Sequence, residues 1–139
     1  MTRSPVRPAA QQRPATLAAL LLAVVSAFQA ALAAGVPWGR AAYGGMHRGA
    51  LPARYRASSA VASVIYGALV LVTVGRGPRA ATRRRILSGA SALMMLGTAM
   101  NLASRSRLER TLWTPVAGTL AVTLLRVARG LPAGDARRG

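Results

Sequence analysis

Polar and apolar positions alternate along this chain in long blocks rather than with a short period. Clusters of arginine separate four uncharged, mostly apolar stretches: residues 14–39, 57–75, 86–104 and 111–125. A hydrocarbon core of about 30 Å requires about 20 apolar residues in a helix. The first three stretches have about that length, whereas the fourth is shorter. There the Arg126 guanidinium can reach up to the membrane interface, so that the helix can continue beyond residue 125. The pattern predicts membrane-spanning helices at about 14–35, 57–75, 86–104 and 111–128.

A soluble four-helix bundle is the alternative, and it would place a polar stripe on every helix. The segments LAALLLAVVSAFQAALAA (17–34) and VASVIYGALVLVTV (61–74) have no polar stripe of sufficient width. We therefore expect an all-α fold, a transmembrane four-helix bundle with a long loop rich in glycine and aromatic residues between the first two helices. A basic N-terminal tail (1–13) and a C-terminal tail (132–139) flank the membrane domain (14–131).

The first apolar segment also has features of a secretory signal peptide. A basic leader precedes it, and Ala31-Leu32-Ala33 has the form of a signal-peptidase site. However, the run from Leu17 to Ala34 exceeds the usual length of a signal-peptide core, and Gln29 lies inside it. We expect a retained helix; cleavage after Ala33 is the alternative and would leave three spans.

The chain has 19 arginines, no lysine and a net charge of +17. A nucleic-acid-binding domain would gather its basic residues on one face with aromatic residues, whereas here they lie between the spans. Twelve arginines fall on the side of the two tails and the middle connection, and seven on the other side, so both termini are expected in the cytoplasm. Anionic headgroups of the plasma membrane are the expected partners of the densest cluster. That cluster comprises Arg76, Arg79, Arg83, Arg84 and Arg85.

The composition offers few residues that could catalyse a reaction or bind a metal ion. There is no cysteine, and His47 is the single histidine, so we expect no metal site and no cofactor. The four spans contain no acidic residue, which argues against ion-coupled transport. No nucleophile is paired with a base in a recognisable arrangement, so we expect no enzymatic activity and no catalytic residue.

Small residues at every fourth position predict where helices approach closely, because lipid provides little hydrophobic drive between them. One stripe comprises Ala19, Ala23, Ala27, Ala31 and Gly35, and a second comprises Ser59, Ser63 and Gly67.

The two loops on the non-cytoplasmic side are the candidate functional face. The first is long, and long loops are often functional. Polar and aromatic residues of this side form a candidate rim: Gln29, Trp38, Arg40, Tyr43, Asn101, Arg105, Glu109 and Trp113.

Glu109 is one of only two acidic residues in the chain, and two interpretations of it remain open. It can be an acid at the start of the fourth helix, where the helix dipole favours it. Alternatively, it can join the two loops by accepting hydrogen bonds from Arg105 or Arg40.

Three segments of the chain carry a resemblance: GVPWGRAAYGG (35–45), LPARYRASSAVAS (51–63) and NLASRSRLERTLWTPV (101–116). In them the chain resembles small, uncharacterised four-span membrane proteins of high-GC actinobacteria. Since that group has no assigned activity, the resemblance implies topology and source only. The absence of lysine beside abundant alanine, glycine and arginine agrees with a GC-rich genome.

We expect a small, non-enzymatic integral membrane protein, an accessory or envelope component with a membrane-protein partner or a second copy of itself. The alternative is a protein that binds or transports a small solute or lipid through the polar rim. No nucleic-acid partner is expected.

Overall fold

The computed structural model describes residues 9–133 and confirms the all-α fold. Helices α1 (Ala9–Ala34), α2 (Ala53–Val74) and α3 (Ala80–Ala103) are followed by a π-helical turn, Glu109–Trp113, that continues into α4 (Thr114–Arg129). Two short 3-10 turns, Gly39–Ala41 and Tyr43–Gly45, lie in the long loop. The described residues contain no strand.

Four helical segments are long and apolar enough to cross a membrane: Gln12–Ala34, Ala53–Val74, Ala80–Ala103 and Glu109–Arg129. Many of their large apolar side chains point outward, among them Leu20, Val64 and Leu93. An exterior of this kind fits contact with lipid, because a soluble bundle would cover such a surface with polar residues.

The first three helices begin earlier than the arginine pattern predicts, and α1 starts at Ala9, inside the segment 1–13 that was expected to be a tail. Arg54 and Arg56 lie inside the first turns of α2, and Arg83 lies inside α3. Arginine is a good helix former, so an arginine cluster marks where the apolar span ends but not where the helix ends. Arg83 illustrates this: it is buried, and its Nε donates to the Val72 carbonyl at 3.0 Å.

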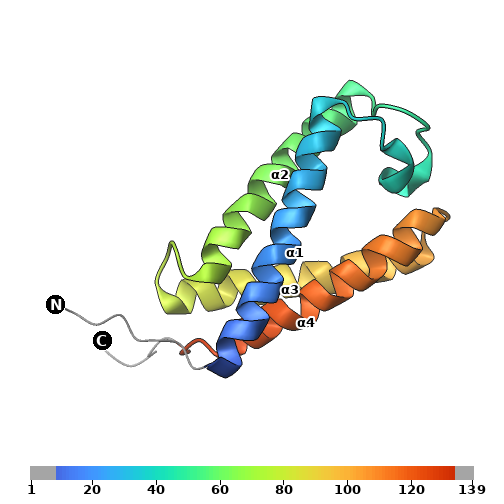
Figure 1. Ribbon diagram of the computed structural model, residues 1–139. Coiled ribbons are helices and arrows are strands. Elements are labelled where there is room, and N and C mark those ends of the chain that lie inside the picture. Colours follow the sequence, from blue (N-terminus) through green and yellow to red (C-terminus); the bar gives the residue numbers. More distant parts are fainter. Residues whose placement is uncertain (1–8, 134–139) are drawn as a thin grey trace.

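The four helices form two hairpins that diverge like the arms of a V (Figure 1). In one hairpin α1 packs along α2, in the other α3 packs along α4, and α1 also contacts α4. The main core lies where the arms meet. It includes Ala18 and Leu22 from α1, Leu87 from α3, and Leu124 and Ala128 from α4.

Serine side chains join the helices within each arm. Ser26 Oγ donates to the Ser63 carbonyl at 2.8 Å, and Ser63 Oγ donates to the Ser26 carbonyl at 3.0 Å. In the other arm Ser91 Oγ donates to the Ala121 carbonyl at 2.6 Å. Each hydroxyl thereby satisfies its donor inside the apolar region, where water cannot.

Only one of the two predicted small-residue stripes is a packing face. In α2, Ser59 is fully buried and Gly67 faces Ser26 of α1. In α1 the stripe is wrong, since Ala23 and Ala27 are exposed. The buried face of α1 runs instead through Ala15, Ala18, Leu22, Val25 and Leu32. On that face Leu22 and Val25 pack with Ala15 and Ala18 in the main core, and Leu32 packs under the long loop.

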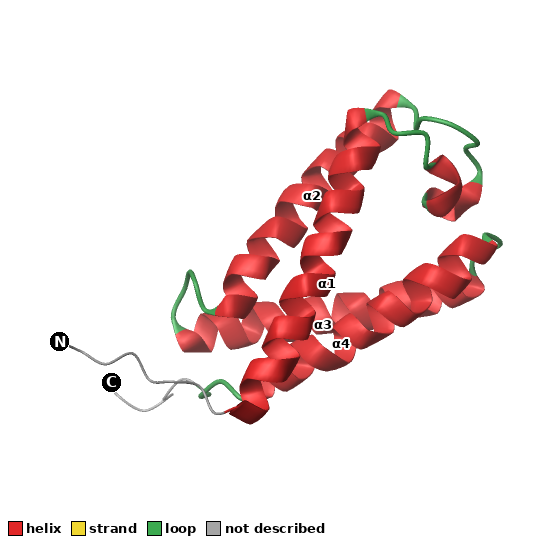
Figure 2. Ribbon diagram, in the orientation of Figure 1, coloured by secondary structure: helices red, strands yellow, loops and turns green. Residues whose placement is uncertain are grey.

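The ends of the helices fall on two opposite sides. The start of α1, the end of α4 and the connection 75–79 lie at one end, where the arms meet (Figure 1). The long loop 35–52 and the short loop 104–108 lie at the other, open end. Figure 2 shows the long loop folded back from the α1–α2 arm toward the α3–α4 arm.

Candidate functional site

The long loop is held in its folded-back conformation by close backbone contacts. Gly39 is buried, and its N–H donates to the Gly49 carbonyl at 3.1 Å. A Cβ on Gly39 would lie 2.7 Å from that carbonyl oxygen, so only glycine allows this approach. Below it Leu32, Ala42 and Leu51 form a small second core with Phe28, Tyr43 and Tyr55 at its edge.

The short loop contains the N-cap of the helix that follows. Ser106 Oγ accepts from the Glu109 N–H at 3.4 Å and donates to the Arg40 carbonyl at 3.1 Å. The sequence Ser-x-x-Glu at 106–109 is the spacing of a capping box, in which the glutamate side chain would turn back to the serine N–H. Here Ser104 Oγ accepts from the Ser106 N–H instead, which leaves the Glu109 carboxylate free to reach the long loop.

Glu109 joins the two loops, although not through arginine. Its Oε1 accepts from the Gly44 N–H at 2.7 Å, and Ser104 Oγ donates to its Oε2. The residue is only 8% exposed. Within residues 9–133 no arginine forms an ion pair with Glu109, so the alternative interpretation is right that Glu109 joins the loops but wrong in naming Arg105 or Arg40 as its partner. Glu109 contacts the loop through a backbone group that Gly44, at φ +76°, presents from a left-handed conformation.

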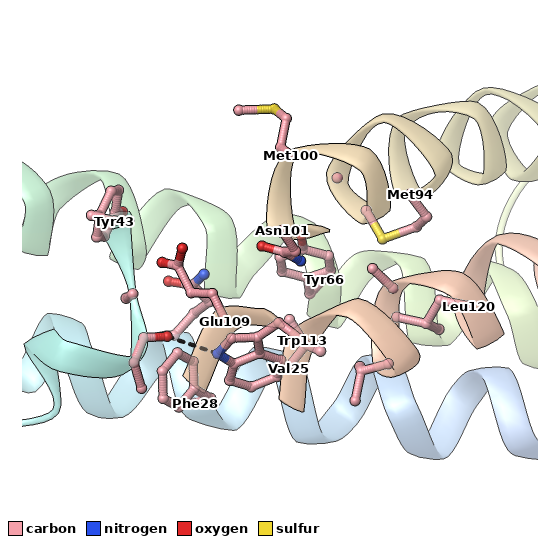
Figure 3. Close-up of a pocket in the computed structure, with 16 residues that line it drawn as sticks. Val25, Phe28, Tyr43, Tyr66, Met94, Met100, Asn101, Glu109, Trp113 and Leu120 are labelled. Carbon is pink, nitrogen blue, oxygen red and sulfur yellow. Dashed lines mark hydrogen bonds between the residues drawn. The ribbon is translucent and has the colours of Figure 1, made fainter. Parts of the chain in front are cut away.

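Trp113 makes a second connection between the arms. Its Nε1 donates to the Ala41 carbonyl at 2.7 Å (dashed in Figure 3). Its ring lies 4.5 Å from that of Phe28, which also stacks on Trp38 at 6.0 Å. Three neighbouring rings therefore accompany the hydrogen bond: Trp113 in the π-helical turn, Phe28 in α1 and Trp38 in the long loop.

The π-helical turn places Glu109 and Trp113 at the same site. Pro115 has no N–H, so the Thr111 carbonyl lacks its normal helical donor, and the proline ring crowds that turn. The turn widens, and the Thr114 N–H donates to the Glu109 carbonyl five residues back. Single π turns of this kind are frequent at functional sites.

A cavity of about 300 Å³ lies between the two arms under the long loop (Figure 3). Its apolar end is formed by Val25, Met94, Val116 and Leu120, and its loop end by aromatic and polar side chains. A second, outer hollow of about 640 Å³ shares Tyr43, Met100, Asn101 and Glu109 with the first and extends to Arg105. Glu109 therefore lies at the junction between the inner cavity and the outer hollow.

Three polar side chains in the inner cavity make no hydrogen bond within the described part of the chain. Gln29 Oε1 is buried without a donor. The Tyr66 hydroxyl and the Asn101 side-chain amide also have no described partner. Of these three groups only the Gln29 oxygen is fully buried. Since buried polar atoms are normally hydrogen-bonded, it is an acceptor that a molecule in the cavity could satisfy.

Tyr43 carries backbone strain at the cavity wall. It has φ +51°, a value that residues other than glycine rarely adopt. Its hydroxyl lies 3.1 Å from Ser59 Oγ and donates to the Tyr55 carbonyl at 3.3 Å. Such strain persists only where surrounding contacts hold it, and it is common at binding sites.

The structure brings together five of the eight rim residues expected from the sequence. They line the inner cavity: Gln29, Tyr43, Asn101, Glu109 and Trp113. Trp38 is half exposed beside Phe28, Arg40 is exposed and contributes its carbonyl, and Arg105 borders only the outer hollow.

Several residues of the site were not anticipated from the sequence. Tyr66 and Phe28 line the cavity, while Ser104 and Gly44 hold Glu109. The Ser-x-x-Glu spacing at 106–109 could have indicated the helix start and the role of this loop. No signal indicated the Gly44 contact, because every residue except proline carries a backbone N–H.

The described residues contain no group of three histidine, cysteine, aspartate or glutamate side chains that could hold a metal ion. The cavity offers amides, hydroxyls, aromatic rings and one carboxylate. No family model, curated protein or solved structure matches the chain.

Proposed function

We propose that this chain is a non-enzymatic membrane protein that binds a small molecule between its two helical arms at the non-cytoplasmic face. Four apolar helices fit a multi-pass membrane protein. The observation that supports binding is the inner cavity of about 300 Å³ with three polar side chains that lack described partners. Its volume is at the lower end of the range of about 300–1,000 Å³ for small-molecule sites.

The proposal includes an orientation in the plasma membrane of an actinobacterial cell. Both termini would lie in the cytoplasm, since more arginines flank that end of the helices. Anionic headgroups would contact the exposed Arg76, Arg79 and Arg85 together with the half-buried Arg84. Arg83 differs from these four, because it is turned toward the end of α2.

The test compares protein purified from native membranes with two glycine variants. Gly97 lines the cavity, and a Cβ there meets no atom within 4 Å, so Gly97→Leu fills space without a clash. Gly89 is the matched control: it lies on the same helix, has equally open surroundings and is outside the cavity. Native mass spectrometry should find a bound small molecule on the wild type and on Gly89→Leu, and lose it on Gly97→Leu.

Two results would contradict binding in this cavity. One is a bound molecule that remains equally on all three proteins. The other is a stoichiometric protein partner without any small molecule, which would instead support the accessory or envelope component expected from the sequence.

A further inference from the structure

We infer that the inner cavity takes a small organic cation, an ammonium group on a compact apolar body, with Glu109 as its counter-charge. This inference rests on the proposed function and names its ligand class. It follows from the charge inside the cavity, the hydrogen-bonding capacity of its walls, and the position of its aromatic rings.

Among the described residues, Glu109 is the only charged side chain that lines the inner cavity. A carboxylate accepts about four hydrogen bonds, two on each oxygen. Glu109 receives one on Oε1 from Gly44 and one on Oε2 from Ser104, and no described arginine pairs with it. A buried carboxylate without a counter-ion attracts a cation strongly, because its field is weakly screened there.

The buried Gln29 oxygen also favours a ligand that donates hydrogen bonds. Gln29 Oε1 can only accept, and it is buried without a donor. The Asn101 amide and the Tyr66 hydroxyl can each accept as well. An ammonium group supplies up to three N–H donors and no acceptor, whereas a carboxylate or phosphate group would leave Gln29 and Glu109 unsatisfied.

Aromatic rings surround the same end of the cavity. Phe28, Tyr43, Tyr66 and Trp113 line it (Figure 3), and Trp113 lies against Phe28. Ring faces attract ammonium groups and retain the attached apolar body. Val25, Met94 and Leu120 at the far end complete an apolar pocket for that body.

The arginines of the loop face do not cancel this preference. Arg40, Arg105, Arg107 and Arg110 are all exposed, so water and salt screen them over about 8 Å. Glu109 is buried among the walls of the cavity and is screened much less.

The experiment measures binding of three probes of matched shape to the full chain in nanodiscs: benzylammonium, benzyl alcohol and benzoate. Benzylammonium should bind about tenfold more tightly than benzyl alcohol, and benzoate should bind weakest. In Glu109→Gln the preference for benzylammonium over benzyl alcohol should disappear.

Because Glu109→Gln also loosens the loops, Gln29→Leu and Asn101→Leu provide an independent test. Neither side chain bonds to the described protein, so the unfolding temperature should not fall, while affinity for benzylammonium should fall severalfold. Gly89→Leu should bind like the wild type. Nanodiscs with and without phosphatidylethanolamine distinguish a free amine from a lipid headgroup, since a bound headgroup would lower the apparent affinity for benzylammonium.

The outcomes separate this inference from the proposed function. If benzyl alcohol or benzoate binds as tightly as benzylammonium and Gly97→Leu abolishes that binding, the cation inference is overturned while the proposed function stands. If none of the three binds and native mass spectrometry finds no molecule that Gly97→Leu displaces, both fail.

Discussion

Glu109 connects two loops through a backbone N–H and a serine hydroxyl, and this choice of partners has an energetic consequence. Hydrogen bonds to a charged group contribute about 1.5–3 kcal/mol, more than an exposed ion pair, which contributes about 0–1 kcal/mol. The donor from Gly44 is a backbone N–H, so it does not depend on which side chains surround it. The stability of the loop face should therefore depend on Ser104 and Glu109 rather than on arginine.

The first prediction concerns Glu109→Gln, which keeps the shape of the side chain and removes its charge. We expect the free energy of unfolding to fall by about 1.5–3 kcal/mol and proteolysis within residues 35–52 to accelerate. Thermal unfolding and limited proteolysis in mild detergent measure the two effects. Coupling with Ser104→Ala should be about 0.5–3 kcal/mol, because the two side chains contact each other.

Arg40→Gln and Arg105→Gln, each combined with Glu109→Gln, are the controls for the coupling with Ser104. Neither arginine pairs with Glu109. The change in the free energy of unfolding caused by each arginine substitution should therefore add to that of Glu109→Gln to within about 0.5 kcal/mol. Strong coupling to either arginine, with none to Ser104, would refute the arrangement seen here.

The second prediction separates the hydrogen bond of Trp113 from its ring. Trp113→Phe keeps an aromatic ring against Phe28 but loses the donor to the Ala41 carbonyl. Leaving that carbonyl without its donor should cost about 0.5–1.5 kcal/mol in thermal unfolding. Trp38→Phe is the matched control, since Trp38 is 50% exposed and its ring only stacks on Phe28. An equal loss in both variants would argue against the hydrogen bond.

At the scale of the helices, each arm is joined by serine hydroxyls that reach carbonyls of the neighbouring helix. The third prediction is that Ser26→Ala and Ser63→Ala each destabilise the α1–α2 arm by about 0.6–1.7 kcal/mol, the range for interhelical hydrogen bonds in membranes. The double variant should lose less than the sum of the single losses, because the two residues bond to each other.

Ser58→Ala is the control for this contact between α1 and α2, since Ser58 Oγ donates to the Arg54 carbonyl of its own helix at 3.1 Å. Unfolding in detergent by heat or by a denaturing detergent measures all four proteins. A loss in Ser58→Ala as large as in Ser63→Ala would show that the effect is local to α2 and not a contact between helices.

For the whole molecule, the fourth prediction is the orientation in the membrane. The chain lacks cysteine, so single cysteines can be labelled without background. Met46→Cys, on the loop face and 74% exposed in the wild type, should react with a membrane-impermeant maleimide in intact cells. Arg79→Cys, in the opposite connection, should react only after permeabilisation. The reverse pattern would overturn the orientation derived from the arginine distribution.

The fifth prediction is that α1 is retained in the membrane. It contributes Leu22 to the core and Val25, Phe28 and Gln29 to the cavity. The intact mass of the protein isolated from membranes should therefore include residues 1–33, apart from loss of the initiating methionine. A mature chain that starts at Ala34 would lack those groups and would contradict both the fold and the proposed site.

The sequence by itself determined the number of helices and the ends at which the loops meet. Hydrocarbon thickness imposes a minimum apolar length, so four uncharged stretches suffice to predict four spans and an all-α fold. Two spans separate the 35–56 and 104–110 segments and so bring them to one end, which is why Gln29, Tyr43, Asn101 and Glu109 could be grouped in advance. The starts of α1, α2 and α3 were predicted less well, since arginine is compatible with both helix and interface.

Only the tertiary structure decided which helices pair, how far the arms diverge and what Glu109 contacts. Packing between apolar helices depends on the fit of side chains such as Leu22 and Leu124, and many faces of an alanine-rich helix are nearly equivalent in sequence. The cavity exists because the arms diverge, so Tyr66 and Phe28 join it from positions that look like ordinary span residues. The partner of Glu109 is a backbone N–H made accessible by the left-handed turn at Gly44. A backbone donor has no side-chain signature, so only the folded chain could identify it.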